Sequence, residues 1–362
     1  MTPASPVGLP VQERLFADEE FAENPPASAP APAPSPPRRR PTRTVLPAPV
    51  PPALQALADA LPRPIRLGTS SWSYPGWKGL VWEDTHPAGD LSQHGLAAYA
   101  AHPLLRTVCI DRTFYRPLQA EEYAAYAQCV GTDFRFVVKA PARVTDALVR
   151  GEDGRGMQPN VRFLDPQHAV DDFVAPALAG LGERCGALVF QLSPLSAHWL
   201  HNIDRLLTRL DTMLGALPSV RSVAPDAVIA VEVRDGVLLT PALAEVLRRH
   251  GATYCVGVHA KLPPLREQLP MLRALWPGPL VCRWNYHRRH GAFGFDEAEQ
   301  AYAPFDRLVD PDLDTRQGLA RVALATATAG HAAYITISNK AEGSAPLSVN
   351  ALAQALQAGA PT

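Results

Sequence analysis

The sequence predicts a (β/α)8 TIM-type barrel that follows a disordered, Pro/Ala-rich N-terminal extension. Three observations lead to this fold class. Eight apolar runs rich in β-branched and aromatic residues recur after residue 53 of the 362. The runs are nearly continuous in apolar character, as strands buried on both faces of a parallel sheet are. Segments with helical spacing separate them, and eight strands alternating with helices are typical of this barrel.

The predicted strands extend over most of the chain after residue 53. They are Ile65–Ser70, Leu105–Tyr115, Phe134–Lys139, Ala187–Leu192, Ala227–Arg234, Thr253–His259, Leu280–Asn285 and Ala333–Asn339. A doubly wound parallel sheet is the main alternative, but such a sheet normally has about five or six strands. The phosphate-binding patterns GxGxxG and GxxxxGK(S/T), which accompany many sheets of that kind, are absent from the sequence.

Predicted helices follow the strands. Their apolar residues recur with helical spacing over 95–102, 120–130, 170–181, 198–217, 241–251, 315–330 and 351–359. Asp314 or Thr315 is a suitable N-cap for the helix at 315–330. Gly251 and Gly330 follow predicted helices, where glycine readily takes the left-handed conformation that ends a helix.

Residues 1–52 are predicted to be a disordered tail, and residues 53–362 to be the barrel domain. Every residue from 25 to 37 is Pro, Ala or Ser, and an arginine-rich stretch follows. Such a segment cannot bury enough apolar surface to offset its ordering entropy. Within the tail, VQERLFADEEF at 11–21 has the pattern of a short amphipathic turn. We interpret it as a docking segment for a protein partner, or else as an unselected part of the tail.

Composition excludes several classes of protein. The net charge of −1 and the pI near 6.8 provide no global attraction for nucleic acid or for an anionic membrane. Neither an apolar run long enough to span a membrane nor a secretory signal is evident in the sequence. The five cysteines form no CxxC pair, and most lie inside apolar runs. We therefore predict reduced, buried thiols in a cytoplasmic protein that binds no membrane.

Polar and ionisable side chains stand at the ends of seven predicted strands, where barrels of this type place their active sites. On the second strand, Asp111, Thr113 and Tyr115 share one face by the two-residue period. The later strands end in Lys139, Gln191, Glu232 with Arg234, His259, Arg283 with Asn285, and Asn339 with Lys340. Each of these residues, taken alone, is also explained by a structural role as one partner of an ion pair. Their coincidence favours a polar pocket, because buried polar groups are costly unless a ligand or a network satisfies them.

The charges at these strand ends indicate the chemistry of the pocket. Lys139, Arg234 and Arg283 outnumber Glu232 and Asp111, which favours a ligand that carries a carboxylate or a phosphate. Glu232 is the predicted acid/base group, since desolvation raises the pKa of a carboxyl group, although the adjacent arginine opposes that shift. Lys139 is predicted to stabilise negative charge, with a role as Schiff-base nucleophile as the alternative.

No cofactor is predicted. Glu232, Asp111 and His259 are the available ligands for a divalent metal, an alternative that stays open although no HxH or HExxH pattern supports it. The stretch RWNYHRRHG at 283–291 has the composition of a nucleic-acid contact, yet one basic patch on a neutral protein is more often a solvated loop. No Ser-His-Asp or Cys-His grouping can be assigned.

The stretch TSSWSYPGWKG at 69–79 combines aromatic residues with the serines, proline and glycines of a loop. It follows the first predicted strand, and so lies at the mouth of the barrel. Trp72, Tyr74 and Trp77 are predicted to wall the pocket, where aromatic rings stack on a sugar or a base. The alternative is that they plug the end of the barrel.

Six ordered motifs carry a family resemblance. They are IRLGTSSWSYPGWKG, DRTFYR, FRFVVKAP, ALVFQLSP, AVEVR and YITISNKAEGSAPLSVNALA. Over about residues 64–358 the chain resembles the YecE-like family, also called domain of unknown function 72. The resemblance implies a TIM-type barrel and a distant relation to sugar-isomerase-like barrels, and it brings no established reaction.

The resemblance also extends to single positions. The matching motif residues are Gly68, Thr69, Trp72, Tyr74, Trp77, Thr113, Phe114, Tyr115, Lys139, Gln191, Glu232, Arg234 and Asn339. On the second strand the family typically has Glu-Ile-Asn-Ser-Thr-Phe-Tyr, whereas this chain begins that stretch with Cys109. This departure argues against a mechanism with two carboxylates. On the seventh strand Arg283-Trp284-Asn285 replaces the usual Arg-Leu-His, so ligand contacts there are expected to differ.

The leading hypothesis is an enzyme that acts on a small polar, anionic, sugar- or nucleotide-like metabolite by sugar-isomerase-like, hydrolase or lyase chemistry. Glu232 and Lys139 are its predicted catalytic residues. The predicted ligand-binding residues are Trp72, Tyr74, Trp77, Thr113, Tyr115, Gln191, Arg234, Arg283, Asn285 and Asn339. Two alternatives remain, a non-catalytic barrel that binds such a ligand or a protein partner, and a nucleic-acid-processing barrel.

Overall fold

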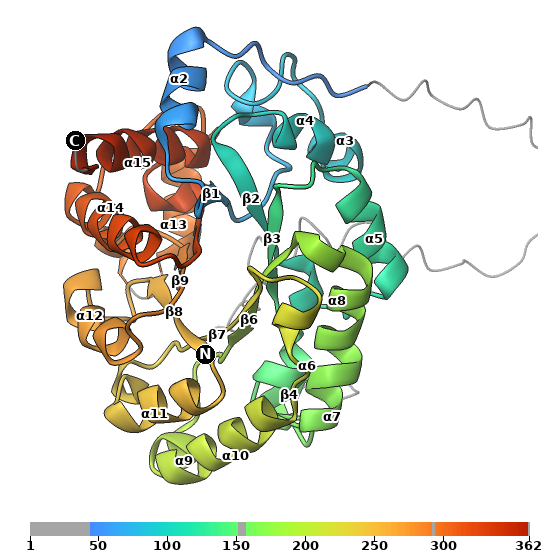
Figure 1. Cartoon of the computed structure of the whole chain (residues 1–362), viewed down its shortest axis with the longest axis vertical. Coiled ribbons are helices and arrows are strands. Elements are labelled where there is room, and N and C mark those ends of the chain that lie inside the picture. Colours follow the sequence, from blue (N-terminus) through green and yellow to red (C-terminus); the bar gives the residue numbers. More distant parts are fainter. Residues whose placement is uncertain (1–43, 151–156, 292–293, 361–362) are drawn as a thin grey trace, which may run out of the picture. The chain divides into compact units, whose positions relative to one another are not determined.

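Eight parallel strands close into a barrel in the order β1-β10-β9-β8-β7-β6-β3-β2 (Figure 1). The computed structural model describes residues 44–150, 157–291 and 294–360. The barrel strands are β1 Ile65–Thr69, β2 Leu105–Ile110, β3 Arg135–Lys139, β6 Cys185–Gln191, β7 Val228–Glu232, β8 Thr253–Val258, β9 Leu280–Trp284 and β10 Ala333–Ile337. Each predicted strand coincides with one of them, so the predicted (β/α)8 TIM-type barrel is confirmed. A short antiparallel pair, β4 Leu148–Arg150 and β5 Met157–Pro159, follows β3.

Helices surround the strands (Figure 1). They are α2 Pro52–Ala60, α3 Ala88–His94, α4 Leu96–Ala100, α5 Ala120–Gln128, α6 Ala142–Thr145, α7 Pro166–Ala169, α8 Ala175–Leu181, α9 Ala197–Leu200, α10 Ile203–Ala216, α11 Pro241–Arg249, α12 Leu265–Ala274, α13 Phe295–Tyr302, α14 Leu313–Thr328 and α15 Ala345–Gly359. The predicted helix at 315–330 corresponds to α14, whose N-cap is Asp312 instead of Asp314 or Thr315. Gly251 and Gly330 follow α11 and α14 with φ of +62° and +80°, as predicted for glycines that end helices.

The alternation of side chains along the strands positions the candidate site. A layer of small and apolar side chains fills the middle of the barrel, with Cys109, Val137, Val189, Ala230 and Val281 among them. The residues two positions further along the chain lie on the same inner face. They are Asp111, Lys139, Gln191, Glu232 and Arg283. The carboxyl end of the barrel is therefore lined by polar and charged groups directly above an apolar layer.

The second strand is shorter than predicted. It ends at Ile110, and Arg112–Phe114 form a turn of 3₁₀ helix. The predicted common face of Asp111, Thr113 and Tyr115 is wrong, because the two-residue period holds only while the backbone stays extended. Thr113 is buried, whereas Tyr115 is 47% exposed.

The amino end of the barrel is closed by an ionic network on the opposite side from the site. The Arg66 guanidinium binds Asp226 at 3.0 Å, and Arg135 contacts the same carboxylate at 3.3 Å. The Tyr334 hydroxyl donates to the carbonyl of Asp226 at 3.0 Å. This end serves the stability of the barrel.

Residues 1–43 of the predicted disordered tail (1–52), and with them the predicted docking segment at 11–21, lie outside the described residues. Residues 45–51 are described and lie against the barrel domain. Val45 and Ala48 are buried, and the Ala48 amide donates to the Val81 carbonyl at 2.9 Å. The helix α2 follows at once and packs against α15.

All five cysteines are free thiols, and four of them are buried. Cys129, at the end of α5, is the exposed one. Within the described ranges, no helix is long and apolar enough to cross a membrane.

Candidate active site

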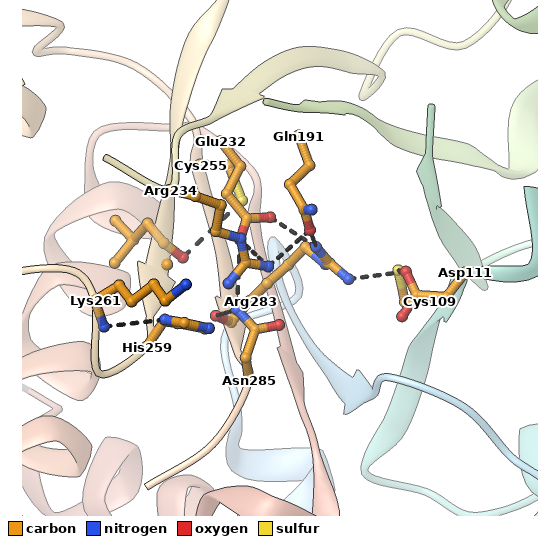
Figure 2. A network of polar contacts seen from close by, with 12 residues as sticks. Cys109, Asp111, Gln191, Glu232, Arg234, Cys255, His259, Lys261, Arg283 and Asn285 are labelled. Atoms are coloured by element: carbon orange, nitrogen blue, oxygen red, sulfur yellow. Dashed lines mark hydrogen bonds and ion pairs between the residues drawn. The ribbon is translucent and has the colours of Figure 1, made fainter. Parts of the chain in front are cut away.

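Arg283 is the centre of the polar network at the barrel mouth (Figure 2). Its Nη1 donates to Glu232 Oε2 at 2.7 Å and to Gln191 Oε1 at 2.8 Å. Its Nη2 donates to Asp111 Oδ1 at 2.8 Å. The side chain begins on β9 and joins β7, β6 and the end of β2, so one guanidinium connects acceptors from well-separated strands. Arg283 is only 4% exposed, and such a buried cation needs these charge-assisted bonds.

Glu232, the last residue of β7, has no exposed surface. Its Oε1 lies 2.9 Å from Arg234 Nη2 and accepts a longer bond of 3.4 Å from Asn285 Nδ2. Burial by itself raises the pKa of the Glu232 carboxyl, but the guanidinium groups of Arg234 and Arg283 outweigh it, so the pKa lies below its ordinary value. Glu232 is therefore a carboxylate at neutral pH.

The space for this carboxylate depends on a glycine of the next strand. Gly257 on β8 lies beside Arg283 in the strand register. A Cβ atom at Gly257 would lie 3.3 Å from Glu232 Oε1 and 2.7 Å from Leu262 Cδ1. The absence of a side chain at Gly257 thus lets Glu232 and Arg283 meet at the barrel mouth.

Lys139 contacts an aromatic ring, whereas Arg234 and Arg283 contact carboxylates. Its Nζ lies 3.5 Å from the centre of the Phe114 ring, a cation–π contact. Among the described residues, no carboxylate lies within 4 Å of it, whereas Arg234 and Arg283 are both paired. Burial, reinforced by repulsion from Arg283 and Arg234, lowers the pKa of Lys139 to about 8, although Asp111 and Glu232 act in the opposite direction.

His259 follows β8 at the same end of the barrel. Burial and the nearby charge of Arg234 lower the pKa of its imidazole to about 3, so the ring is neutral. Its Nδ1 accepts from the Lys261 amide at 3.1 Å, which leaves Nε2 as the nitrogen that carries the hydrogen. Within the part of the chain that the structure describes, no three His, Cys, Asp or Glu side chains group as a metal site requires. The expectation that the protein has no resident metal stays a prediction.

The aromatic loop after β1 packs mainly against the protein itself. Trp77 has no exposed surface, and its Nε1 donates to Asn339 Oδ1 at 3.0 Å. The Tyr74 ring lies between Trp77 and Phe305, at centroid distances of 5.1 and 5.5 Å. Trp72 is 7% exposed, and its Nε1 has no partner among the described residues. The Trp77 indole is thus satisfied by Asn339, whose own Nδ2 is buried without a partner among the described residues, and the predicted ligand contacts of both residues are untested.

Replacing Trp77 by phenylalanine is expected to lower the free energy of unfolding by about 1–3 kcal/mol. The smaller ring leaves a cavity, and the bond from the indole to Asn339 is lost. Urea denaturation measures the change. Trp276→Phe is the control, because Trp276 is 50% exposed and its replacement should cost less than about 0.5 kcal/mol. Equal losses for the two variants would contradict a structural role of Trp77.

The structure brings together only part of the predicted set. Gln191, Glu232, Arg234, Arg283 and Asn285 form one bonded network. Thr113 belongs to the wall beneath it, since its hydroxyl donates to the carbonyls of Ile110 and Lys139 at 2.9 and 2.5 Å. Tyr115 packs edge-on against Phe114, with ring centroids 5.5 Å apart.

Two contacts of the network were not assigned by the sequence analysis. Asp111 is an anchor of Arg283, and Cys109 Sγ donates to the same Asp111 oxygen at 3.2 Å. The two-residue spacing of Cys109 and Asp111 was the sequence signal for their contact, since residues two apart along a strand lie on the same face. Phe114, the ring under Lys139, had no such signal because it lies in the 3₁₀ turn.

The basic stretch at 283–291 is occupied by contacts within the protein. Arg288 donates to the carbonyls of His259 and Leu262. Arg289 is paired with Asp310, and His290 Nε2 lies 2.7 Å from the Tyr302 hydroxyl. These contacts hold the loop after β9 in place, and the predicted absence of nucleic-acid binding stays a prediction.

Fold and site together define a (β/α)8 barrel with a charged site at the carboxyl ends of its strands. The chain belongs to the family described as Protein of unknown function DUF72, whose model matches residues 66–362. This confirms the resemblance to the YecE-like family found in the sequence. No curated protein matches the chain.

Solved structures of this family share the fold. A DUF72 family protein from Enterococcus faecalis V583 is similar with a TM-score of 0.53 and 16% identity, covering 82% of this chain and 97% of that chain. A DUF72 family protein from Thermotoga maritima MSB8 has a TM-score of 0.52 and 19% identity, covering 81% of this chain and 99% of that chain. At these identities the likeness concerns the fold alone.

Proposed function

We propose that the barrel mouth is the active site of an enzyme for a small polar, anionic, sugar- or nucleotide-like molecule. In this proposal Lys139 holds the anion, Arg234 and Arg283 stabilise developing charge, and Glu232 is the acid/base group. One observation carries the proposal: Lys139 is a half-buried cation with no carboxylate within 4 Å among the described residues, in a site where Arg234 and Arg283 are both paired.

The energetic argument concerns the unpaired ammonium. A buried charge without a partner is costly, and the lowered pKa of Lys139 expresses that cost. A ligand anion beside Lys139 would restore the charged form and recover part of this free energy. The same groups would contribute little to binding a neutral molecule, so the site is selective for anions.

Glu232 acts in this proposal first as a base. Its carboxylate is ionised in the free protein, so it has a proton acceptor to offer and no proton to donate. The contact with Asn285 is the longest of its bonds, at 3.4 Å, and is therefore the one that a ligand displaces most easily. Gln191 and Asn285 supply amide groups that suit the hydroxyls of a sugar.

The first experiment is mass spectrometry of small molecules that co-purify with the protein, followed by incubation of each candidate with the pure protein. The proposal expects an anionic molecule that the protein converts to a product, and a Glu232→Gln variant that binds it without turnover. A ligand that is bound and never converted would instead favour the non-catalytic barrel. Binding of nucleic acid that weakens steeply with salt would favour the nucleic-acid-processing barrel.

Lys139→Met is expected to abolish the rise in melting temperature that the anionic ligand produces. In the wild type the affinity should be constant below about pH 8 and fall as the pH rises, because the ammonium loses its proton there. Isothermal titration calorimetry between pH 6 and 10 measures this profile. Arg221→Met is the control, since Arg221 is an exposed cation in the turn before β7, at the opposite end of the barrel from Lys139. An affinity that stays unchanged up to pH 10 would contradict the role of Lys139.

A further inference from the structure

We infer that the anionic group bound beside Lys139 is a carboxylate and not a phosphate, so that the substrate is a sugar acid or a hydroxy acid. The inference rests on the proposed function above and narrows its substrate class. Barrels of this type commonly bind phosphate with backbone amides of the loops after the last two strands and with the N-terminus of a following helix. In this chain those loops follow β9 and β10.

Most of the described amides after β10 are already engaged. Ser338 Oγ accepts from the Lys340 amide at 3.2 Å, and the Asn339 carbonyl accepts from the Gly343 amide at 2.8 Å. Asn339 Oδ1 accepts from the amide of Ala345, the first residue of α15, at 2.8 Å. The carboxamide of Asn339 therefore occupies the helix N-terminus that a phosphate would use.

The buried carboxylate of Glu342 lies in the same turn. Glu342 has no exposed surface, and its Oε1 accepts from the Asp312 amide at 2.7 Å and from Arg316 Nη2 at 2.6 Å. Because Glu342 is the partner of Arg316, this arginine has no unmatched charge for a dianion at the loop after β10. The loop thus provides its own anion where a phosphate-binding barrel receives one from the ligand.

The described amides after β9 are engaged as well. The Asn285 amide donates to the Val258 carbonyl at 3.1 Å, and the His287 amide donates to the Lys340 carbonyl at 2.8 Å. The Arg289 amide donates to His287 Nδ1 at 3.1 Å. These bonds use most of the amide donors that a phosphate would need over the described part of this loop.

The cations lead to the same conclusion. Lys340 is paired with Glu299 and Arg289 with Asp310, so neither offers an unmatched charge to a ligand. Lys139 offers one positive charge, which a carboxylate matches, whereas a phosphate monoester carries about −1.5 to −2 at neutral pH.

Matched pairs of ligands test the inference on the full-length protein. Each pair has the same carbon skeleton and differs in its anion: glucuronate with glucose 6-phosphate, ribonate with ribitol 1-phosphate, and glycerate with glycerol 3-phosphate. Calorimetry measures the affinities for the wild type and for Lys139→Met. We expect the carboxylate of at least one pair to bind about tenfold or more tightly than its phosphate, and the Lys139→Met variant to lose this binding.

Two other outcomes have different meanings. If the phosphates bind as tightly as the carboxylates or more tightly, and Lys139→Met loses that binding, the carboxylate class is overturned while the anion site stands. If no member of any pair binds the wild type, both the carboxylate inference and the proposed anion site fail.

Discussion

Glu232→Leu is expected to lower the free energy of unfolding by about 3–5 kcal/mol, because it leaves two buried guanidinium groups without their shared carboxylate. Arg283 and Arg234 contact the two oxygens of Glu232 at 2.7 and 2.9 Å, and Glu232 itself has no exposed surface. Asp111 remains as an acceptor for Arg283 alone, and Gln191 Oε1, which accepts from both arginines, carries no charge. Urea denaturation at neutral pH measures the loss.

Glu245→Gln provides the control for this prediction. Glu245 is also paired with an arginine, Arg248, but both side chains are more than half exposed. Its replacement should change the free energy of unfolding by less than about 1 kcal/mol. A loss for Glu232→Leu no larger than that of the control would contradict the assignment of Glu232 as the counter-ion of the network.

Because the Glu232 carboxylate takes up a proton in acid, the difference in the free energy of unfolding between the wild type and Glu232 variants depends on pH. The pKa of Glu232 in the folded protein lies below its ordinary value of 4.5, so the charged form favours folding. This contribution is complete above pH 4.5 and is lost as the pH falls through the lower pKa of the folded state. The stabilities of the wild type and of Glu232→Gln should therefore converge on acidification.

Gly68→Ala is the second change with a large expected effect, a loss of more than about 4 kcal/mol of stability or failure to accumulate as folded protein. A Cβ atom at Gly68 would lie 1.8 Å from the Thr107 carbonyl oxygen. The two residues are partners of β1 and β2, at the point where the register between these strands shifts. Relief of this overlap would require the strands to separate.

Gly131→Ala is the matched control for Gly68→Ala. A Cβ atom at Gly131 meets no heavy atom within 4 Å, and its φ is not among the positive ones. The soluble yield and the urea midpoint of this variant should be close to those of the wild type. A Gly68→Ala variant with the stability of Gly131→Ala would contradict the close approach of β1 and β2.

Much of the candidate site follows from the pattern of the strands. Val137 with Lys139, Val189 with Gln191, and Val281 with Arg283 are each two residues apart and share the inner face of one strand. Because parallel strands of a barrel end at the same side, the polar members of these pairs had to lie at one mouth. The excess of cations at that mouth could be counted from the sequence for the same reason.

The second strand shows where this reasoning stops. The apolar run Leu105–Tyr115 continues through a 3₁₀ turn, which the period of the residues does not reveal. Thr113 and Tyr115 therefore left the face on which they were expected. The turn placed Phe114 under the Lys139 ammonium instead, a contact between two strand ends that no local pattern encodes.

The aromatic loop after β1 is a second place where the local sequence does not determine the contacts of its side chains. Its composition predicts an aromatic cluster near the barrel mouth, but it does not specify the neighbours of each ring. The indole of Trp77 meets Asn339, which is 262 positions away in the chain, and is fully buried by that contact. Trp72 and Tyr74 belong to the same loop and have different surroundings.

The sequence by itself determined the eight-stranded barrel, the strand ends that carry polar groups and the excess of cations among them. These properties depend on local periodicity, which each segment expresses through its own residues. The tertiary structure alone decided which charges are paired: Glu232 with Arg283 and Arg234, and Asp111 with Arg283. It also placed the Lys139 ammonium against an aromatic ring instead of a carboxylate. Pairing depends on distances of a few ångströms between side chains from different strands, and those distances are set only when the barrel closes.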